Sequence, residues 1–137
     1  IGIWTAEFTQ GYTPAATGLD RWIAWDKGEF IGKVAAQAAE APKQVLTMLE
    51  VDADNADSVG FEPIWKDGEI VGMTTSGGYG HRLERSFALA MLNTDLTAEG
   101  TELTVHVMGE ERACKVIAMS PYDPTGAKMR AWARWRR

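Results

Sequence analysis

The 137-residue sequence predicts a mainly β protein: an antiparallel barrel of about six strands with an irregular aromatic segment and one helix before it. Short runs of alternating apolar and polar residues recur over residues 44–119, with turn signals between them, which is typical of antiparallel barrels and sandwiches. Asp67 and Gly68 separate two of the apolar runs, and an Asp-Gly pair in this position is a strong hairpin signal. Helical spacing is clearest over residues 30–40, before the strands begin.

The first 25 residues are predicted to be irregular and rich in aromatic side chains. Their five large rings belong to Trp4, Phe8, Tyr12, Trp22 and Trp25. Rings of this size need partners to cover them, so they either cap the core of this chain or belong to an interface with further sequence. The chain starts at Ile1 without a methionine, which favours a piece of a longer protein over a trimmed mature N-terminus.

One helix is expected over residues 30–40. Asp26 and Glu29 have the spacing of a capping box, in which each side chain bonds a backbone N–H of the first turn. Apolar residues then recur at helical spacing, and Pro42 ends the pattern. Gly32 weakens the first turn, so the helix could also start one residue after it.

Alternation predicts a first strand over residues 45–51, and the small polar residues that follow predict a loop over 52–60. Residues 63–65 and 69–75 are expected to form the two arms of the Asp-Gly hairpin. The glycines of residues 76–80 predict a flexible break after it.

Three more strands are expected, the first of them over residues 86–92. We expect its large side chains inside and its small ones outside, with Phe87, Leu89 and Met91 on one face and Ala88 and Ala90 on the other. Residues 103–107 and 113–119 complete the barrel, joined by a turn at 109–110. The chain then divides into residues 1–43, a barrel over 44–125 and a basic aromatic tail over 126–137.

Composition narrows the function classes. The net charge is −5, from 14 basic and 19 acidic residues, whereas nucleic-acid-binding modules usually carry a basic face. Cys114 is the only cysteine and there are two histidines, so neither a disulfide framework nor a metal site is expected. With no apolar run of the ~20 residues that a membrane helix needs and no export leader in view, we expect a cytoplasmic protein without nucleic-acid or membrane partners.

Single motifs do not name an activity. The glycines at 77–80 lack the spacing of a phosphate loop. His106 alternates with valines and is expected to point outward, while His81 and Arg82 fit a solvated loop better than an anion site. Cys114 is expected to be a buried structural thiol.

Several segments, taken in order, carry a family pattern instead. They are residues 8–14 with 18–25, then 26–33, then 68–79 and 86–90. Together they resemble the aminomethyltransferase (glycine-cleavage T-protein) superfamily: the end of its folate-binding region, the segment before its helix, its hairpin and the strand that follows.

The end of the chain resembles one branch of that superfamily. Residues 121–124 read Pro-Tyr-Asp-Pro and are followed by Met129 and Arg130, which resembles the closing motif of the branch fused to flavin dehydrogenases such as dimethylglycine and sarcosine dehydrogenase. The likeness extends from Trp4 to Arg130. It departs from the family at residues 80–83, where Gly-His-Arg-Leu replaces the usual Ser-Pro-x-Leu, so the conformation of that loop does not carry over.

The resemblance implies a C-terminal, folate-associated part of a flavin-dependent N-methyl amine dehydrogenase that passes a one-carbon unit to tetrahydrofolate. It implies no catalytic residue in this chain. Trp4, Tyr79 and Arg130 are the implied tetrahydrofolate contacts, shared with an upstream folate region, and FAD would be bound only by an upstream flavin domain. The chain alone is expected to be inactive. The alternatives are an aminomethyltransferase of the glycine cleavage system and a non-catalytic barrel that docks on a partner domain.

Overall fold

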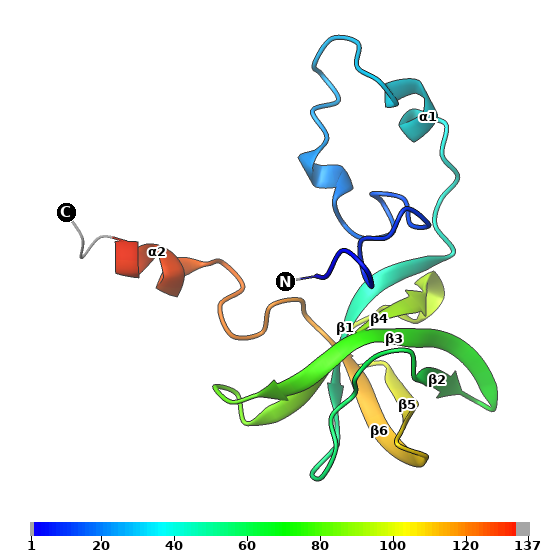
Figure 1. Ribbon diagram of the computed structural model, residues 1–137, viewed down its shortest axis with the longest axis vertical. Helices are drawn as coiled ribbons and strands as arrows, with labels where there is room; N and C mark the ends of the chain where they lie inside the picture. The colour runs from blue at the N-terminus through cyan, green and yellow to red at the C-terminus, as the bar shows by residue number, and fades with distance from the viewer. Residues whose placement is uncertain (1, 134–137) are drawn as a thin grey trace.

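Six antiparallel strands close into a barrel in the computed structural model, which describes residues 2–133 (Figure 1). The strands are β1 (Gln44–Val51), β2 (Pro63–Lys66), β3 (Glu69–Gly80), β4 (Arg85–Asn93), β5 (Glu102–Val107) and β6 (Glu110–Ile117). Their order around the barrel is β1-β4-β3-β2-β5-β6, and every neighbouring pair is antiparallel. The predicted mainly β, six-stranded antiparallel barrel is therefore confirmed.

Strand alternation places the core inside the barrel. The buried cluster consists of Leu49, Val51, Ile64, Val71, Ala88, Ala90, Leu92, Leu103, Val105, Val107, Cys114 and Val116. The predicted facing of β4 is wrong, because Ala88 and Ala90 point into this cluster and Phe87 and Leu89 are only half-buried outside it. A closed six-stranded barrel has a narrow interior, and small side chains on one strand leave room for the branched side chains of the others.

The hairpin between β2 and β3 forms where the sequence places it. Asp67 and Gly68 have φ of 51° and 82°, the left-handed pair that a tight two-residue hairpin requires. Met108 and Gly109 repeat this geometry between β5 and β6, with φ of 52° and 83°. That turn therefore lies one residue before the predicted position.

The predicted flexible break at residues 76–80 is wrong. Strand β3 continues to Gly80, and Gly77 pairs with Ala88 of β4. A Cβ at Gly77 would lie 2.5 Å from the Ser58 carbonyl oxygen. Gly77 therefore lets the 52–60 loop pack closely against β3, and it is not a flexible hinge.

The predicted helix over residues 30–40 is shorter than expected. The helix α1 spans Lys33–Gln37, because Gly32 at its N-cap has φ of 88° and cannot be helical. The predicted capping box is also wrong, since no side chain caps α1 and Glu29 instead forms an ion pair with Lys33 at 3.8 Å.

Within residues 2–133 the structure has three further helical segments: η1 (Asp20–Trp22), η2 (Thr94–Leu96) and α2 (Ala127–Ala133). The Asp123 carboxylate accepts hydrogen bonds from the backbone N–H groups of Lys128 and Met129 at 3.3 and 3.2 Å, which satisfies donors in the first turn of α2. The last basic and aromatic residues of the tail, 134–137, lie outside the described residues. Within residues 2–133, no helix is long and apolar enough to cross a membrane.

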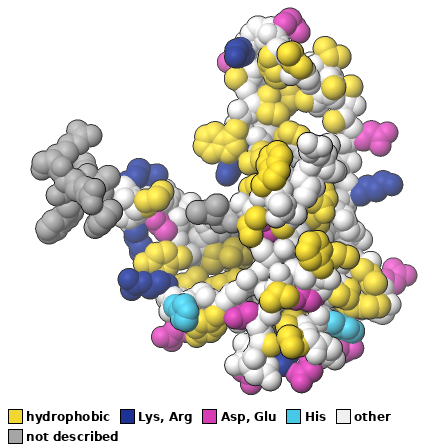
Figure 2. All heavy atoms as spheres, viewed as in Figure 1, with side chains coloured by type: hydrophobic (Ala, Val, Ile, Leu, Met, Phe, Trp, Pro, Cys, Tyr) yellow, Lys and Arg dark blue, Asp and Glu magenta, His cyan; other side chains and the backbone are white. Residues whose placement is uncertain are grey.

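Residues 2–43 rise above the barrel (Figure 1), and hydrophobic side chains gather on them in the space-filling view (Figure 2). Their first part is bonded to the barrel: the Ala16 carbonyl accepts from the Leu46 N–H at 2.7 Å, and the Glu7 carboxylate accepts from the Ser76 hydroxyl at 2.6 Å. Ala16 and Glu7 are buried, with 4% and 0% of their surface exposed. Residues 2–17 are thus an integral cover of the barrel.

Candidate functional site

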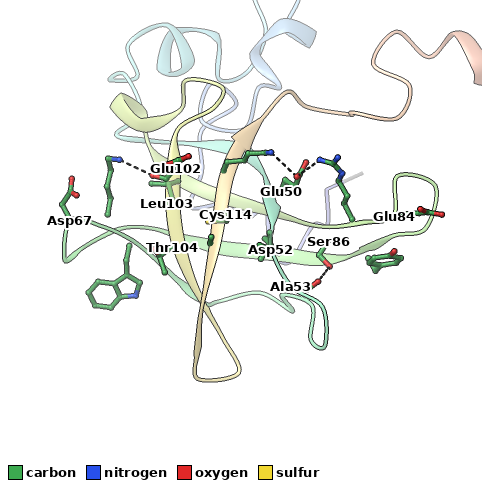
Figure 3. A pocket seen from close by; sticks show the side chains of 17 residues that line it. Glu50, Asp52, Ala53, Asp67, Glu84, Ser86, Glu102, Leu103, Thr104 and Cys114 are labelled. Carbon is green, nitrogen blue, oxygen red and sulfur yellow. Dashed lines mark hydrogen bonds and ion pairs between the residues drawn. The ribbon is translucent and has the colours of Figure 1, made fainter.

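A hollow of about 830 Å³ is lined by residues from all six strands of the barrel (Figure 3). Its apolar surface comes from core side chains such as Val51, Leu103 and Cys114. Charged side chains, among them Glu50 and Arg85, surround this surface. Eight of the seventeen lining residues are charged, so the hollow is more polar than the usual ligand pocket.

Glu50, one of the charged residues that line this hollow, is paired with two basic side chains. The Glu50 carboxylate on β1 accepts from Arg85 of β4 at 2.7 Å and lies 3.2 Å from the Lys115 ammonium of β6. Burial raises the pKa of Glu50, but the hydrogen bonds and charges of Arg85 and Lys115 outweigh burial and hold that pKa below its ordinary value. Glu50 therefore joins three neighbouring strands and is not poised as a general acid or base.

Tyr79 is the sequence-predicted site residue that lines this hollow. It stands near the end of β3, opposite Ser86 of β4, and leaves 45% of its surface exposed. The His81 ring meets it edge-on, with centroids 5.1 Å apart. Tyr79 also lines a second hollow of about 670 Å³, bounded by the loop after β1. Its ring is therefore available for stacking from the barrel mouth.

Trp4 and Arg130 lie elsewhere. Trp4 is 69% exposed in the segment before the barrel. Arg130 is on α2, and its guanidinium donates to the Thr125 carbonyl oxygen. Among the described residues, no hydrogen bond, ion pair or ring contact joins any two of Trp4, Tyr79 and Arg130, and neither Trp4 nor Arg130 lines the two hollows. These three residues thus do not line one hollow in the described part of the chain, and their folate role stays a prediction.

The remaining sequence candidates have structural surroundings. His106 stacks on Trp65 with centroids 5.4 Å apart and lies 3.3 Å from the Glu111 carboxylate. Cys114 is buried in the core, and burial raises the pKa of its thiol to about 12, so it is not an activated nucleophile. Across residues 2–133 there is no group of three or more metal-ligating side chains.

Sequence reasoning missed two carboxylates with several hydrogen bonds each, the buried Glu7 and the half-buried Glu62. Glu7 accepts from the Ile3 N–H and the Ser76 hydroxyl, each at 2.6 Å. Burial raises the pKa of Glu7, but these bonds, with a further one from Thr75, outweigh burial and hold that pKa below its ordinary value. The partner strand lies 69 positions away along the chain, so no local pattern could have marked Glu7.

Glu62 organises the loop that leads into β2. Its carboxylate accepts from the Ser58 hydroxyl at 2.7 Å, from the Val59 and Gly60 N–H groups at 2.8 and 2.9 Å, and from the Thr74 hydroxyl. Three of these donors meet Oε2 and one meets Oε1, so the carboxylate holds the loop to β3 and has a structural role.

Comparison with known proteins places this geometry in a family. Residues 44–123 match the family model of the glycine cleavage T-protein C-terminal barrel domain. The chain belongs to this family. Its barrel, from β1 to β6, lies wholly within the match, and of the three predicted folate contacts only Tyr79 does.

Relatives of two kinds share this barrel. Mouse (Mus musculus) dimethylglycine dehydrogenase is 32% identical over 117 residues, which are 83% of this chain and 14% of that protein. The aminomethyltransferase of Synechocystis sp. is 32% identical over 120 residues, 85% of this chain and 32% of that protein. The chain thus spans about a seventh of the former and a third of the latter.

A solved structure has the same fold. The glycine cleavage system aminomethyltransferase T from Bartonella henselae superposes with a TM-score of 0.78 at 21% identity, over 87% of this chain and 34% of that one. The T-protein resemblance seen in the sequence is therefore confirmed.

Proposed function

We propose that this chain is the C-terminal, folate-associated part of a flavin-dependent N-methyl amine dehydrogenase that passes a one-carbon unit to tetrahydrofolate. The observation that supports it is the match to dimethylglycine dehydrogenase over 83% of the chain, together with the Pro-Tyr-Asp-Pro segment at 121–124. Dimethylglycine and sarcosine are the substrates of this proposal. Its partners are an upstream folate region and an upstream flavin domain.

In this proposal the flavin supplies hydride removal from the amine, and tetrahydrofolate accepts the resulting one-carbon unit. In the described residues Tyr79, Trp4 and Arg130 do not share a hollow, and Gly77 to Gly80 are paired strand rather than a nucleotide loop, so the proposal shares the folate site with an upstream region and leaves the flavin to an upstream domain. The part of this chain is to offer one wall of the folate site, with the Tyr79 ring at its surface, and to keep water from the reactive carbon.

An exchange of barrels tests the proposal. This chain replaces the matched 117 residues of the mouse dehydrogenase and, separately, the matched 120 residues of the Synechocystis aminomethyltransferase. We expect the dehydrogenase exchange to keep dimethylglycine-dependent dye reduction and to release less formaldehyde when tetrahydrofolate is added. Flavin absorbance shows that the exchanged protein has folded. Activity in the aminomethyltransferase exchange alone would support the glycine-cleavage alternative instead.

The isolated chain is expected to bind tetrahydrofolate no better than about millimolar and to reduce no dye with dimethylglycine and added FAD. A missing second wall removes roughly 100 Å² of apolar contact from the pterin, which costs about 2.5 kcal/mol at ~25 cal/mol per Å², nearly two decades in affinity. Titration calorimetry measures this directly. A dissociation constant in the low micromolar range would mean that the folate site lies within these 137 residues.

A further inference from the structure

The seam between β2 and β5 is the shortest of the strand pairings that close the barrel. The residue pairs that form it are Ile64 with Val105 and Trp65 with Thr104. By contrast, β1 and β4 are joined by eight residue pairs. The seam stops at one end because Pro63, the first residue of β2, has no N–H to donate. At its other end the turn at Asp67 and Gly68 leads the chain into β3.

The register of the hairpin decides which backbone groups close this seam. Lys66 and Glu69 pair directly across the two-residue turn, so their backbone groups bond each other. Successive residues of a strand direct these groups to opposite sides. The backbone groups of Trp65 therefore face β5, where they meet those of Thr104. The backbone hydrogen bonds of the seam thus come from this one residue pair.

The side-chain contacts across the seam lie close to the protein surface. The Lys66 ammonium donates to the Glu102 carbonyl oxygen at 3.2 Å in an exposed position. The Trp65 ring stacks on the half-buried His106 ring, with centroids 5.4 Å apart. The indole N–H of Trp65 is buried and has no hydrogen-bond partner among the described residues. A buried donor without a partner raises the free energy of the closed seam, and opening returns that donor to water.

The tip of the β2–β3 hairpin carries no core residue. Residues 65–70 are half-buried or exposed, whereas Ile64 before them and Val71 after them belong to the buried cluster. The pairing of β2 with β3 shifts register between Ile64 and Trp65, which places a β-bulge at the base of the tip. Segments with few buried apolar contacts open locally while the rest of a protein stays folded. The tip can therefore move while Ile64 and Val71 hold its base.

The hollow of about 830 Å³ spans this seam. Its lining includes residues from both sides of it: Trp65, Lys66 and Asp67 from the hairpin, and Glu102, Leu103 and Thr104 from β5. Figure 3 shows Asp67 at the hairpin turn, on the same side of the hollow as Glu102 and Thr104. We propose that residues 65–70 are a flap that swings away from β5 and so sets the width of the hollow. This inference does not depend on the proposed function.

Hydrogen exchange in the purified 137-residue chain, followed by NMR, tests the flap. We expect the backbone N–H groups of Trp65 and Thr104, and the Trp65 indole N–H, to exchange at least roughly 100-fold faster than the N–H groups bonded between β1 and β4. Low urea concentrations should hardly change the faster rates, because a local opening exposes little surface. If the groups at the seam exchange as slowly as those between β1 and β4, the flap does not open and the inference is wrong.

A disulfide across the seam should lock the flap. Directly opposite residues of an antiparallel pair have Cα atoms about 4.5–5.5 Å apart, which suits a disulfide. In the double variant Trp65→Cys, Thr104→Cys, oxidation should slow exchange of the backbone N–H groups at positions 65 and 104 at least roughly 10-fold, and a reductant should restore it. Met48→Cys, Leu89→Cys is the control, because these residues pair between β1 and β4, and its oxidation should leave exchange at the seam unchanged. Equal exchange in the two forms of the seam variant would overturn the proposal.

Loss of the ring stack should open the flap further. His106→Ala removes the partner of the Trp65 ring, and we expect exchange at the seam to rise about 5-fold. His81→Ala is the matched control, because it removes a ring contact of the same kind, with Tyr79 at 5.1 Å, and it should leave the seam unchanged. Circular dichroism checks that each variant has folded, and this pair tests the flap even if the double cysteine variant does not fold. Equal rates in His106→Ala and the wild type would contradict the inference.

Discussion

Replacing Glu7 with glutamine tests whether a single buried carboxylate holds residues 2–17 on the barrel. The side chain is fully buried and accepts two hydrogen bonds of 2.6 Å, from the Ile3 N–H and the Ser76 hydroxyl. Glutamine has the same shape, and its amide nitrogen can face the Ser76 hydroxyl, whose oxygen accepts as well as donates. Both hydrogen bonds then lose their charged acceptor, which costs about 1 kcal/mol for each bond and about 2 kcal/mol in all. For a chain of this length the melting temperature falls by about 6 °C.

The pH dependence separates this effect from a loss of shape. Burial raises the pKa of Glu7, and the hydrogen bonds from Ser76, Thr75 and Ile3 lower it further than burial raises it, so the folded-state pKa lies below the ordinary value of 4.5. A depressed carboxylate pKa gives stability that is complete above the unfolded-state value and is lost as the pH falls through the folded-state pKa. The gap between wild type and Glu7→Gln should be full at pH 7 and close on acidification below about pH 4.5.

Urea unfolding followed by circular dichroism at several pH values measures both quantities. Glu69→Gln is the control, because Glu69 is exposed on β3, the strand that carries Ser76. Surface changes of this kind alter the free energy of unfolding by no more than about 0.5 kcal/mol. If Glu7→Gln is as stable as that control at pH 7, the Glu7 carboxylate does not hold residues 2–17 on the barrel. If the loss of stability is the same at pH 3 as at pH 7, the charge of the carboxylate is not the cause.

Two further predictions concern the barrel itself. Gly77→Ala should destabilise the protein by about 2 kcal/mol or more in urea unfolding, because its Cβ would lie 2.5 Å from the Ser58 carbonyl oxygen. Gly78→Ala is the control and should be nearly neutral, because nothing lies within 4 Å of a Cβ at this position. Equal effects of the two changes would contradict the packing argument. Cys114, with a pKa raised to about 12 by burial, should not react with Ellman's reagent at pH 8 until guanidinium unfolds the chain; rapid reaction of the native protein would show that the thiol is accessible.

The sequence determined the strands and turns because their signals are local. Alternating apolar and polar residues over 45–51 and 103–107 indicate strands with one buried face, and the structure has strands there. Asp67 and Gly68 favour a hairpin turn because both residues tolerate a positive φ, which both have in the structure. Each family motif likewise consists of a few consecutive residues. The barrel and its family could therefore be predicted from the sequence.

The candidate site was predictable only in part. The Tyr79 ring lies at the barrel mouth, where it lines both hollows. Trp4 and Arg130 lie on segments before and after the barrel, and their positions depend on contacts that no spacing in the sequence encodes. Glu50 carries no local mark either, since its partners stand on two other strands.

Tertiary structure decided which face of each strand turned inward. Residues 86–92 have apolar side chains on both faces of the strand, so alternation does not tell which face meets the core. In the structure Ala88 and Ala90 face the core, because the narrow barrel interior has room for small side chains. The same holds for Gly77, which is strand rather than hinge because the 52–60 loop packs on it, and for Glu7, whose partner is 69 positions away. Local patterns fix backbone conformation, whereas facing, close approach and buried pairing are fixed by segments that meet only in the folded chain.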